Sequence, residues 1–260
     1  MKALQPERPS LTLTSLLFLL GLFQSCQSIA TELEKIDYTA QHLKVLPTID
    51  GSDTDHVWKD LPWYPIDQLI LGNKVSQEDF YGRFKIAWNK NQIYLLAEIQ
   101  DDVLIDTHAD PLEFYWDDDA LEIFIDSDNS GGIHKTNHSA FAYHVSLDNQ
   151  LIDIGTNGKP INFSNHGHSV WKRSSHSPHS IIWEVALDVY DHTYDEAKSD
   201  NQLEILSAGK RLGFALAYCD ADYGRTREHF ISSKDVPAVD GNKNRGYIDA
   251  DTFGTLLLQD

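Results

Sequence analysis

A run of aromatic and acidic residues leads directly into a segment with the pattern of a β-strand. Trp116 is followed by three aspartates and then by the segment 120–126. Period-two alternation places the large aliphatic residues of this segment on one face and Glu122 on the other. A sugar ring stacks its C–H face on an aromatic ring, and carboxylate or amide groups bind its hydroxyls. Trp116 and Glu122 therefore indicate sugar recognition; a core aromatic beside a solvated acidic loop remains the alternative.

The same region contains a pair of acids that could support catalysis. Asp118 and Glu122 could serve as acid and nucleophile for hydrolysis of O-glycosyl bonds. Close acidic pairs also arise by chance, because the chain has 40 Asp and Glu residues. A hydrolase needs one carboxyl group with a raised pKa in an enclosed site, and no sequence feature marks such enclosure around a second acid. We predict a non-catalytic protein and keep a hydrolase as the alternative.

The loop that follows the strand offers hard oxygen ligands. Asp126 and Asp128 lie in the sequence DSDNSGG, where small residues separate carboxylates as a calcium site requires. An ordinary turn closed by Asp and Asn side chains is the alternative. Asp50, Asp53 and Asp55 form a second cluster of the same kind. We predict structural calcium, with Asp126 and Asp128 as its candidate ligands.

Histidine and cysteine usage limits other metal and cofactor chemistry. Twelve histidines could in principle supply a bis-His haem site, but Met1 is the only methionine and no spacing singles out a His pair. We keep a haem-binding sandwich as an alternative and expect no haem. With Cys26 acylated, only Cys219 remains, which excludes an intrachain disulfide and a cysteine-based metal site.

The N-terminus has the layout of a secretory signal. Lys2 and Arg8 precede an apolar run over residues 11–23, and Ser25 precedes Cys26. We predict a signal peptide over 1–25 and acylation of Cys26, which gives an exported lipoprotein on the outer membrane, facing the periplasm or the cell surface. Soluble periplasmic export and an uncleaved anchor are the alternatives.

The charge balance restricts the partners. The chain carries a formal net charge of −19. Removal of residues 1–25 takes away two basic residues and one acidic residue, so the mature chain is at −20. Nucleic acid and anionic lipid are poor partners for such a surface, so we expect membrane contact through the lipid anchor only.

The rest of the chain reads as strands. Residues 83–88 and 92–99 alternate on either side of Asn89-Lys90-Asn91, which predicts a β-hairpin. Further alternating runs cover 120–125, 140–147, 181–187, 212–218 and 255–258. Only Tyr194–Ala197 and the segment around Trp58 suggest short helices. We predict an all-β protein, an antiparallel β-sandwich over residues 42–260 after a tether at 26–41.

Several markers recur in an order that resembles carbohydrate-binding module family 9, between about residues 46 and 258. They are Ile49-Asp50-Gly51, Asp55, Trp58, Asp101-Asp102, the run Trp116 to Asp126, Trp183-Glu184-Val185-Ala186 and Phe253-Gly254-Thr255-Leu256. The resemblance implies a β-sandwich that binds an oligosaccharide or polysaccharide and assists polysaccharide use. It also implies structural calcium and, because family members are often joined to catalytic domains, glycan-degrading enzymes as partners.

The resemblance also implies a sugar site with defined residues. A sugar is held between two aromatic rings, which correspond here to Trp116 and Tyr247, with Asn244 as the amide ligand and Glu122 as the carboxylate. The family can carry an arginine on the strand after the acidic loop, where this chain offers His144. A histidine that is neutral at pH 7 lacks the charge-assisted hydrogen bonds of an arginine.

Overall fold

Alternating apolar residues build two layers of β-strands in a computed structural model that describes residues 35–173, 180–224 and 226–260. Residues 36–260 form one unit. The signal segment 1–25, Cys26 and most of the predicted tether lie outside the described residues. Among the described residues, no helix is long and apolar enough to cross a membrane.

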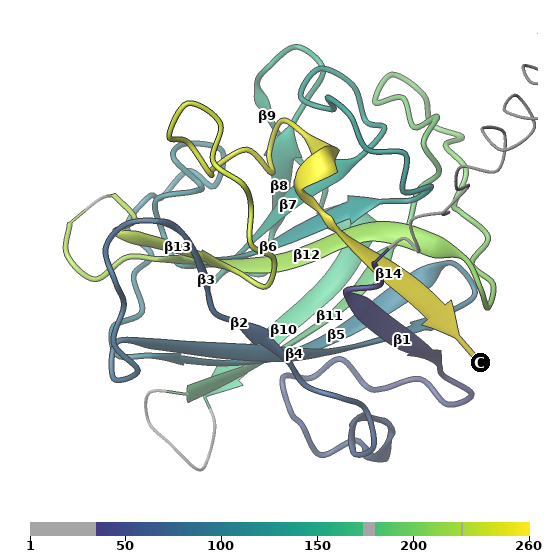
Figure 1. Cartoon of the computed structure of the whole chain (residues 1–260), viewed down its shortest axis with the longest axis horizontal. Coiled ribbons are helices and arrows are strands. Elements are labelled where there is room, and N and C mark those ends of the chain that lie inside the picture. Colours follow the sequence, from purple (N-terminus) through teal and green to yellow (C-terminus); the bar gives the residue numbers. More distant parts are fainter. Residues whose placement is uncertain (1–34, 174–179, 225) are drawn as a thin grey trace, which may run out of the picture. The chain divides into compact units, whose positions relative to one another are not determined.

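Each layer is a sheet of hydrogen-bonded strands (Figure 1). The first layer has the order β10 (Gly167–Arg173), β11 (Ser180–Asp188), β5 (Gln92–Asp101) and β4 (Phe80–Asn89). The second has the order β14 (Gly254–Gln259), β12 (Arg211–Asp220), β6 (Ala120–Asp126), β7 (Phe141–Ser146), β8 (Leu151–Ile154) and β9 (Pro160–Asn162). All neighbours within the two layers pair antiparallel, so the predicted antiparallel sandwich is confirmed.

Three shorter strands extend the layers and one strand joins them. β2 (Tyr64–Ile66) pairs with β4, while β13 (His229–Ser232) pairs with β12 and with β3 (Gln68–Leu71). β1 (Tyr38–His42) runs parallel to both β4 and β14 and thereby connects the two layers. The fold is therefore a sandwich whose sheets are continuous at one edge.

The core lies between the layers and uses the apolar face of each strand. Its largest buried side chains include Trp183, Phe84, Phe214 and Tyr143, none more than 1% exposed. A second, smaller cluster covers the outer face of β6 and β12 and is rich in alanine. The first face fills the core, and the small side chains of the alanine-rich outer face leave room for a site.

One boundary prediction and one helix prediction are wrong. Ordered structure starts earlier than predicted, because β1 begins at Tyr38 within the expected tether; its partners, such as Leu256 and Ala87, are too distant in sequence to be recognised. Tyr194–Ala197 forms turns instead of a helix, since the side chain of Asp195 accepts the Ala197 N–H at 3.0 Å. The short helix at Trp58 is confirmed as the 3-10 turn η1 (His56–Trp58).

Candidate functional site

A pocket of about 280 Å³ opens on the outer face of the second layer. Its lining comprises Tyr115, Trp116, Glu122, His144, Ile154, Arg227, Asn244 and Tyr247. All five residues predicted for sugar binding therefore lie around one pocket, although they come from four separate segments of the chain. Three further residues, Tyr115, Ile154 and Arg227, were not predicted.

The floor of the pocket is a pair of neighbouring residues on β6 and β7. Glu122 lies directly opposite His144 in the strand register, and the His144 Nε2 and Glu122 Oε2 atoms are 3.3 Å apart. On the other side of β6, Glu122 pairs with Ala217 of β12. Small side chains such as Ala217 and Ala142 leave the space above the floor open, which explains the alanine-rich alternation of these strands.

Trp116 lies at the end of a loop that aspartate side chains hold in place. Asp118 accepts hydrogen bonds from the backbone N–H groups of Thr107 and His108 at 3.0 and 2.9 Å. Trp116 is 37% exposed, whereas Tyr115 beside it is 7% exposed, and the two rings stand edge-on at 4.9 Å between centroids. Tyr115 thus supports the exposed ring from the protein side.

Asn244 and Tyr247 come from the loop that precedes β14. A Cβ atom at Gly246 would lie 2.5 Å from the ring of Phe124, so only glycine lets this loop pass so close to β6. The ammonium of Lys135 lies 5.4 Å from the centre of the Tyr247 ring. The glycine therefore brings the second aromatic ring to the pocket rim, with a cation beside it.

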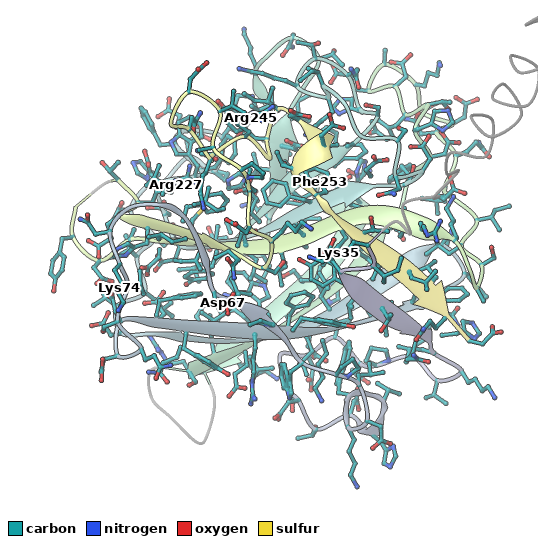
Figure 2. All side chains as sticks on the ribbon, in the orientation of Figure 1. Lys35, Asp67, Lys74, Arg227, Arg245 and Phe253 are labelled. Carbon is teal, nitrogen blue, oxygen red and sulfur yellow. The ribbon has the colours of Figure 1, made fainter. Side chains whose placement is uncertain are left out.

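Arg227 supplies a guanidinium group to the pocket. It lies between β12 and β13 (Figure 2), and its Nη1 donates to the Cys219 Sγ at 3.1 Å. Its guanidinium carbon is 4.5 Å from the centre of the Phe230 ring. The resemblance indicated an arginine near the position of His144; here the pocket arginine comes from a different segment, which no local pattern marks.

Burial determines the charge of the pocket floor. Removal from water raises the pKa of Glu122 to about 8, although the nearby positive charge of Arg227 opposes the shift. Burial and the same positive charge lower the pKa of His144 to about 3, and burial raises the pKa of Cys219 to about 12. At pH 7 the floor consequently carries a mostly protonated carboxyl, a neutral imidazole and a thiol.

The acidic pair considered for hydrolysis does not meet in the pocket. Asp118 accepts hydrogen bonds from the backbone at residues 107–108, and its carboxylate lies 3.1 Å from His108 Nδ1. Burial would raise the pKa of Asp118, but the hydrogen bonds from residues 107–108 outweigh it and hold the pKa below the ordinary value. Of the described residues that line the pocket, Glu122 is the one carboxyl group and His144 the one histidine. The pocket thus lacks the two facing carboxyl groups of a glycosidase and a second axial histidine for haem among those residues.

A second cluster of acids lies where β5, β6 and β12 meet. Asp101, Asp119 and Asp220 are at most 1% exposed, and one ligand oxygen of each lies within 4.8 Å of the others. Burial and the charge of Asp101 raise the pKa of Asp119 and raise that of Asp220 to about 8. Asp220 Oδ1 has no hydrogen-bond partner among the residues described. Asp101 was recognised only as part of a family marker.

The loop predicted to bind calcium satisfies its carboxylates internally. Asp126 accepts the backbone N–H groups of Asp128 and Gly131 at 3.2 and 2.8 Å, and Asp128 accepts that of Ser130 at 3.1 Å. His192 Nδ1 lies 3.6 Å from Asp128 Oδ2. In the described part of the chain, neither aspartate belongs to a group of three residues that could bind a metal ion together. The loop has the geometry of a turn closed by Asp side chains, which is the alternative to a calcium site.

Comparison with known proteins identifies the family. A family profile described as carbohydrate family 9 binding domain-like matches residues 49–260. Endo-1,4-beta-xylanase C of Paenibacillus barcinonensis is 29% identical over 228 residues, which cover 86% of this chain and 18% of that protein. Exoglucanase XynX of Acetivibrio thermocellus is 25% identical over 212 residues, or 82% of this chain and 16% of that protein.

A solved structure shares the fold. A family 9 module from Caldicellulosiruptor kristjanssonii, determined in complex with cellotriose, superposes with a TM-score of 0.61 at 19% identity and covers 85% of this chain and 93% of its own. The chain spans less than a fifth of the length of the two enzymes, so it matches only a part of each. Since the profile covers most of the sequence, the chain belongs to the carbohydrate family 9 binding domain-like family, that is, to carbohydrate-binding module family 9.

Proposed function

We propose that this protein binds an oligosaccharide or polysaccharide chain in the pocket of the second layer without cleaving it. The observation that carries the proposal is the pocket lining, which combines two aromatic rings, Trp116 and Tyr247, with the polar groups of Glu122, Asn244 and Arg227. Aromatic rings stack on the apolar face of a sugar, while the polar groups orient its hydroxyls. The complex of a related module with cellotriose supports a β-linked glucan as a first ligand to test.

The proposal is tested by a glycan-array screen of the chain from Ser28 onward, followed by titration calorimetry on each hit. We expect saturable binding of at least one glycan with one site per chain and no release of shorter products during incubation. Absence of binding to every glycan in the screen would contradict carbohydrate binding. Release of reducing ends by the purified chain would favour the hydrolase alternative.

We further propose that calcium binds at Asp101, Asp119 and Asp220, because their oxygen atoms are the hard ligands that calcium prefers. Three clustered carboxyl groups removed from water repel one another when ionised, and a bound cation would compensate for this. The unpartnered Oδ1 of Asp220 supports the fit. A bound ion would hold together the ends of β5 and β12 and the start of β6, which follows the Trp116 loop.

We also propose that the protein is exported and anchored through an acylated Cys26, and that it works beside glycan-degrading enzymes. The charged start, the apolar run at 11–23 and the Ser25-Cys26 pair support export and acylation. The matches to parts of a xylanase and an exoglucanase support a role next to such enzymes. The anchor would keep captured glycan close to the cell.

A further inference from the structure

Arg227 is a charged group that forms no ion pair with the described residues around the pocket. Its Nη1 donates to the Sγ of Cys219, and its ring contact is with Phe230. Among the described residues, no carboxylate oxygen lies within ion-pair distance of its guanidinium; Asp117 instead accepts the backbone N–H of Arg227 at 3.3 Å. Nearby Glu122 and Asp117 help to raise the pKa of Arg227 against the effect of burial, but neither carboxyl group lies within ion-pair distance of it, so a direct ion pair is left for a ligand to make.

This arrangement is unusual for the chain. The sequence carries 40 acidic and 21 basic residues, so acidic partners are abundant. Arginines elsewhere have them: Arg83 lies 2.6 Å from Glu98, and Arg245 forms an ion pair with Asp249. A cation left unpaired in so acidic a protein points to a partner that comes from outside.

A second cation lies at the rim. Lys135 contacts the Tyr247 ring and lines a hollow of about 410 Å³, which shares Tyr115, Trp116 and Ile154 with the pocket. Among the described residues Lys135 forms no ion pair. The two hollows therefore form a continuous surface around Trp116, with one cation in the pocket and one beside its rim.

We infer that the preferred ligand unit is an acidic sugar, a uronic acid, whose carboxylate pairs with the guanidinium of Arg227. A planar carboxylate matches the fork of donors on an arginine, and two parallel hydrogen bonds fix its orientation. Lys135 binds a carboxylate on the next sugar unit of an acidic chain. The inference rests on the proposed sugar binding and specifies its substrate class.

The neighbouring floor groups fit an anionic ligand. Burial raises the pKa of Glu122 to about 8, so at neutral pH its carboxyl group donates a hydrogen bond instead of repelling a second carboxylate. His144 carries no charge there. Arg227 is thus the one full charge among the described residues that line the pocket.

Matched sugar pairs test the inference, because each pair differs only by a carboxylate in place of a hydroxymethyl group. Glucose and glucuronate, galactose and galacturonate, and mannose and mannuronate, each as a disaccharide, are titrated by calorimetry at pH 7. We expect at least one uronate to bind ten times more tightly than its neutral partner or better. Arg227→Gln should reduce that preference to threefold or less, while Lys172→Gln, which removes one positive charge from the first layer, should leave it unchanged.

Each outcome decides between the two proposals. Equal or tighter binding of the neutral member in every pair would overturn the acidic-sugar inference and leave sugar binding intact. Failure of all six disaccharides and of every glycan in the array would overturn both. If Arg227→Gln lowers the melting temperature markedly, Arg227→Lys provides the second variant. Because this variant keeps the charge, it should retain part of the preference for the uronate. If it loses binding to neutral and acidic sugars alike, the guanidinium has no specific role in recognising the carboxylate.

Discussion

Trp116 and Tyr247 offer aromatic surface to a pocket, whereas most large rings of the chain fill the core. We expect Trp116→Ala and Tyr247→Ala each to weaken glycan binding tenfold or more, because a stacked ring contributes about 1–3 kcal/mol in comparable sites. The melting temperature should change little for Trp116→Ala, since Trp116 is 37% exposed, and more for Tyr247→Ala, since Tyr247 packs against the alanine-rich cluster. Titration calorimetry and thermal melts of each variant provide the measurement.

The matched control is Trp183, which is 0% exposed between the sheets. Trp183→Ala should lower the free energy of unfolding by about 3–5 kcal/mol, as expected for loss of a large buried ring. If either pocket substitution leaves affinity unchanged, or destabilises the fold as Trp183→Ala does, that ring is not part of the sugar site.

Glu122 makes stability depend on pH. Its pKa rises from 4.5 in water to about 8 in the fold, chiefly through burial, so the folded state favours the protonated acid. The stabilisation is complete below pH 4.5 and is lost as pH rises towards and through 8. Glu122→Gln mimics the protonated form and should therefore melt higher than the parent at pH 8, by roughly 2–4 °C for each kcal/mol recovered, but not at pH 4.5. If the melting temperatures of the parent and of Glu122→Gln change in parallel across this pH range, the Glu122 carboxylate is not buried as described.

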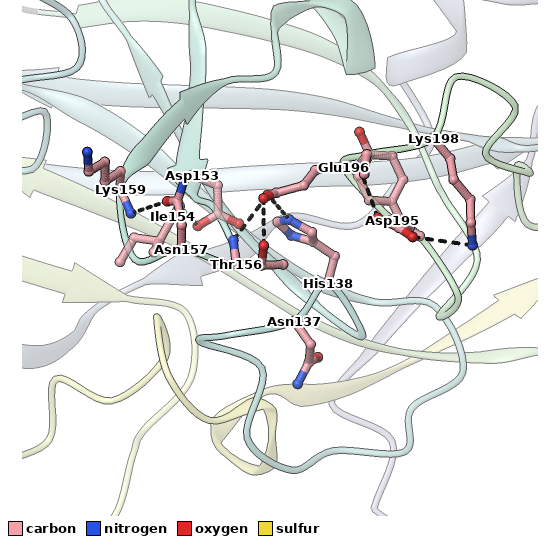
Figure 3. A network of polar contacts seen from close by, with 12 residues as sticks. Asn137, His138, Asp153, Ile154, Thr156, Asn157, Lys159, Asp195, Glu196 and Lys198 are labelled. Atoms are coloured by element: carbon pink, nitrogen blue, oxygen red, sulfur yellow. Dashed lines mark hydrogen bonds and ion pairs between the residues drawn. The ribbon is translucent and has the colours of Figure 1, made fainter.

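The β8–β9 hairpin carries Ile154 to the pocket and is held by a polar network (Figure 3). Glu196 accepts the Thr156 N–H at 3.1 Å and lies 2.9 Å from the Nε2 of His138, which is buried. Glu196→Ala should lower the free energy of unfolding by about 1–3 kcal/mol, because hydrogen bonds to a charged group are lost. Denaturant unfolding measures the change.

The same network contains its own control. Lys198 forms an exposed ion pair with Asp195 at 3.4 Å, and such pairs contribute at most about 1 kcal/mol. Lys198→Ala should therefore have a smaller effect than Glu196→Ala. Equal effects of the two substitutions would show that Glu196 does not fasten the hairpin.

The strand ends that carry the Asp101, Asp119 and Asp220 cluster should respond to calcium. Burial raises the pKa of each, so without metal the stability they contribute at low pH is lost as pH rises from about 4 through 9. Calcium binds the ionised form, and the rise in melting temperature between chelator and millimolar calcium should be larger at pH 8 than at pH 5. Thermal melts at both pH values measure it.

Two substitutions distinguish the candidate calcium sites. Asp220→Asn should abolish the calcium-dependent rise, whereas Asp128→Asn should preserve it, because the Asp128 carboxylate is bonded within its own loop. The reverse pattern would favour calcium binding at Asp126 and Asp128. If calcium does not change the melting temperature of the parent protein, calcium binds at neither site.

For the molecule as a whole, attachment to the membrane is predicted to depend on one atom, the Cys26 sulfur. Cys26→Ser should abolish acylation and release the protein into the soluble fraction, because the variant can be exported but has no sulfur to carry the lipid. Metabolic labelling with a fatty acid and fractionation measure this. Equal labelling of parent and variant would exclude Cys26 as the anchor.

The sequence by itself determined the strands and their inward faces. Alternation fixed which side of 120–126 meets the core, so Glu122 was correctly placed on the outer face. Such patterns are local, since a strand shows its two faces within a few residues. Family spacing added Asn244 and Tyr247, which no periodicity indicates and which the fold brings to the same pocket as Trp116.

Only the tertiary structure decided which distant groups meet. Arg227 reaches the pocket from the segment between β12 and β13, and Asp101 and Asp220 at the ends of β5 and β12 meet Asp119, which directly precedes β6. β1 likewise depends on partners more than 40 residues away or at the opposite end of the chain. These contacts depend on the sheet register and on burial, and burial also sets the pKa values of the site. Neither the register nor the burial can be read from the spacing of residues along the chain.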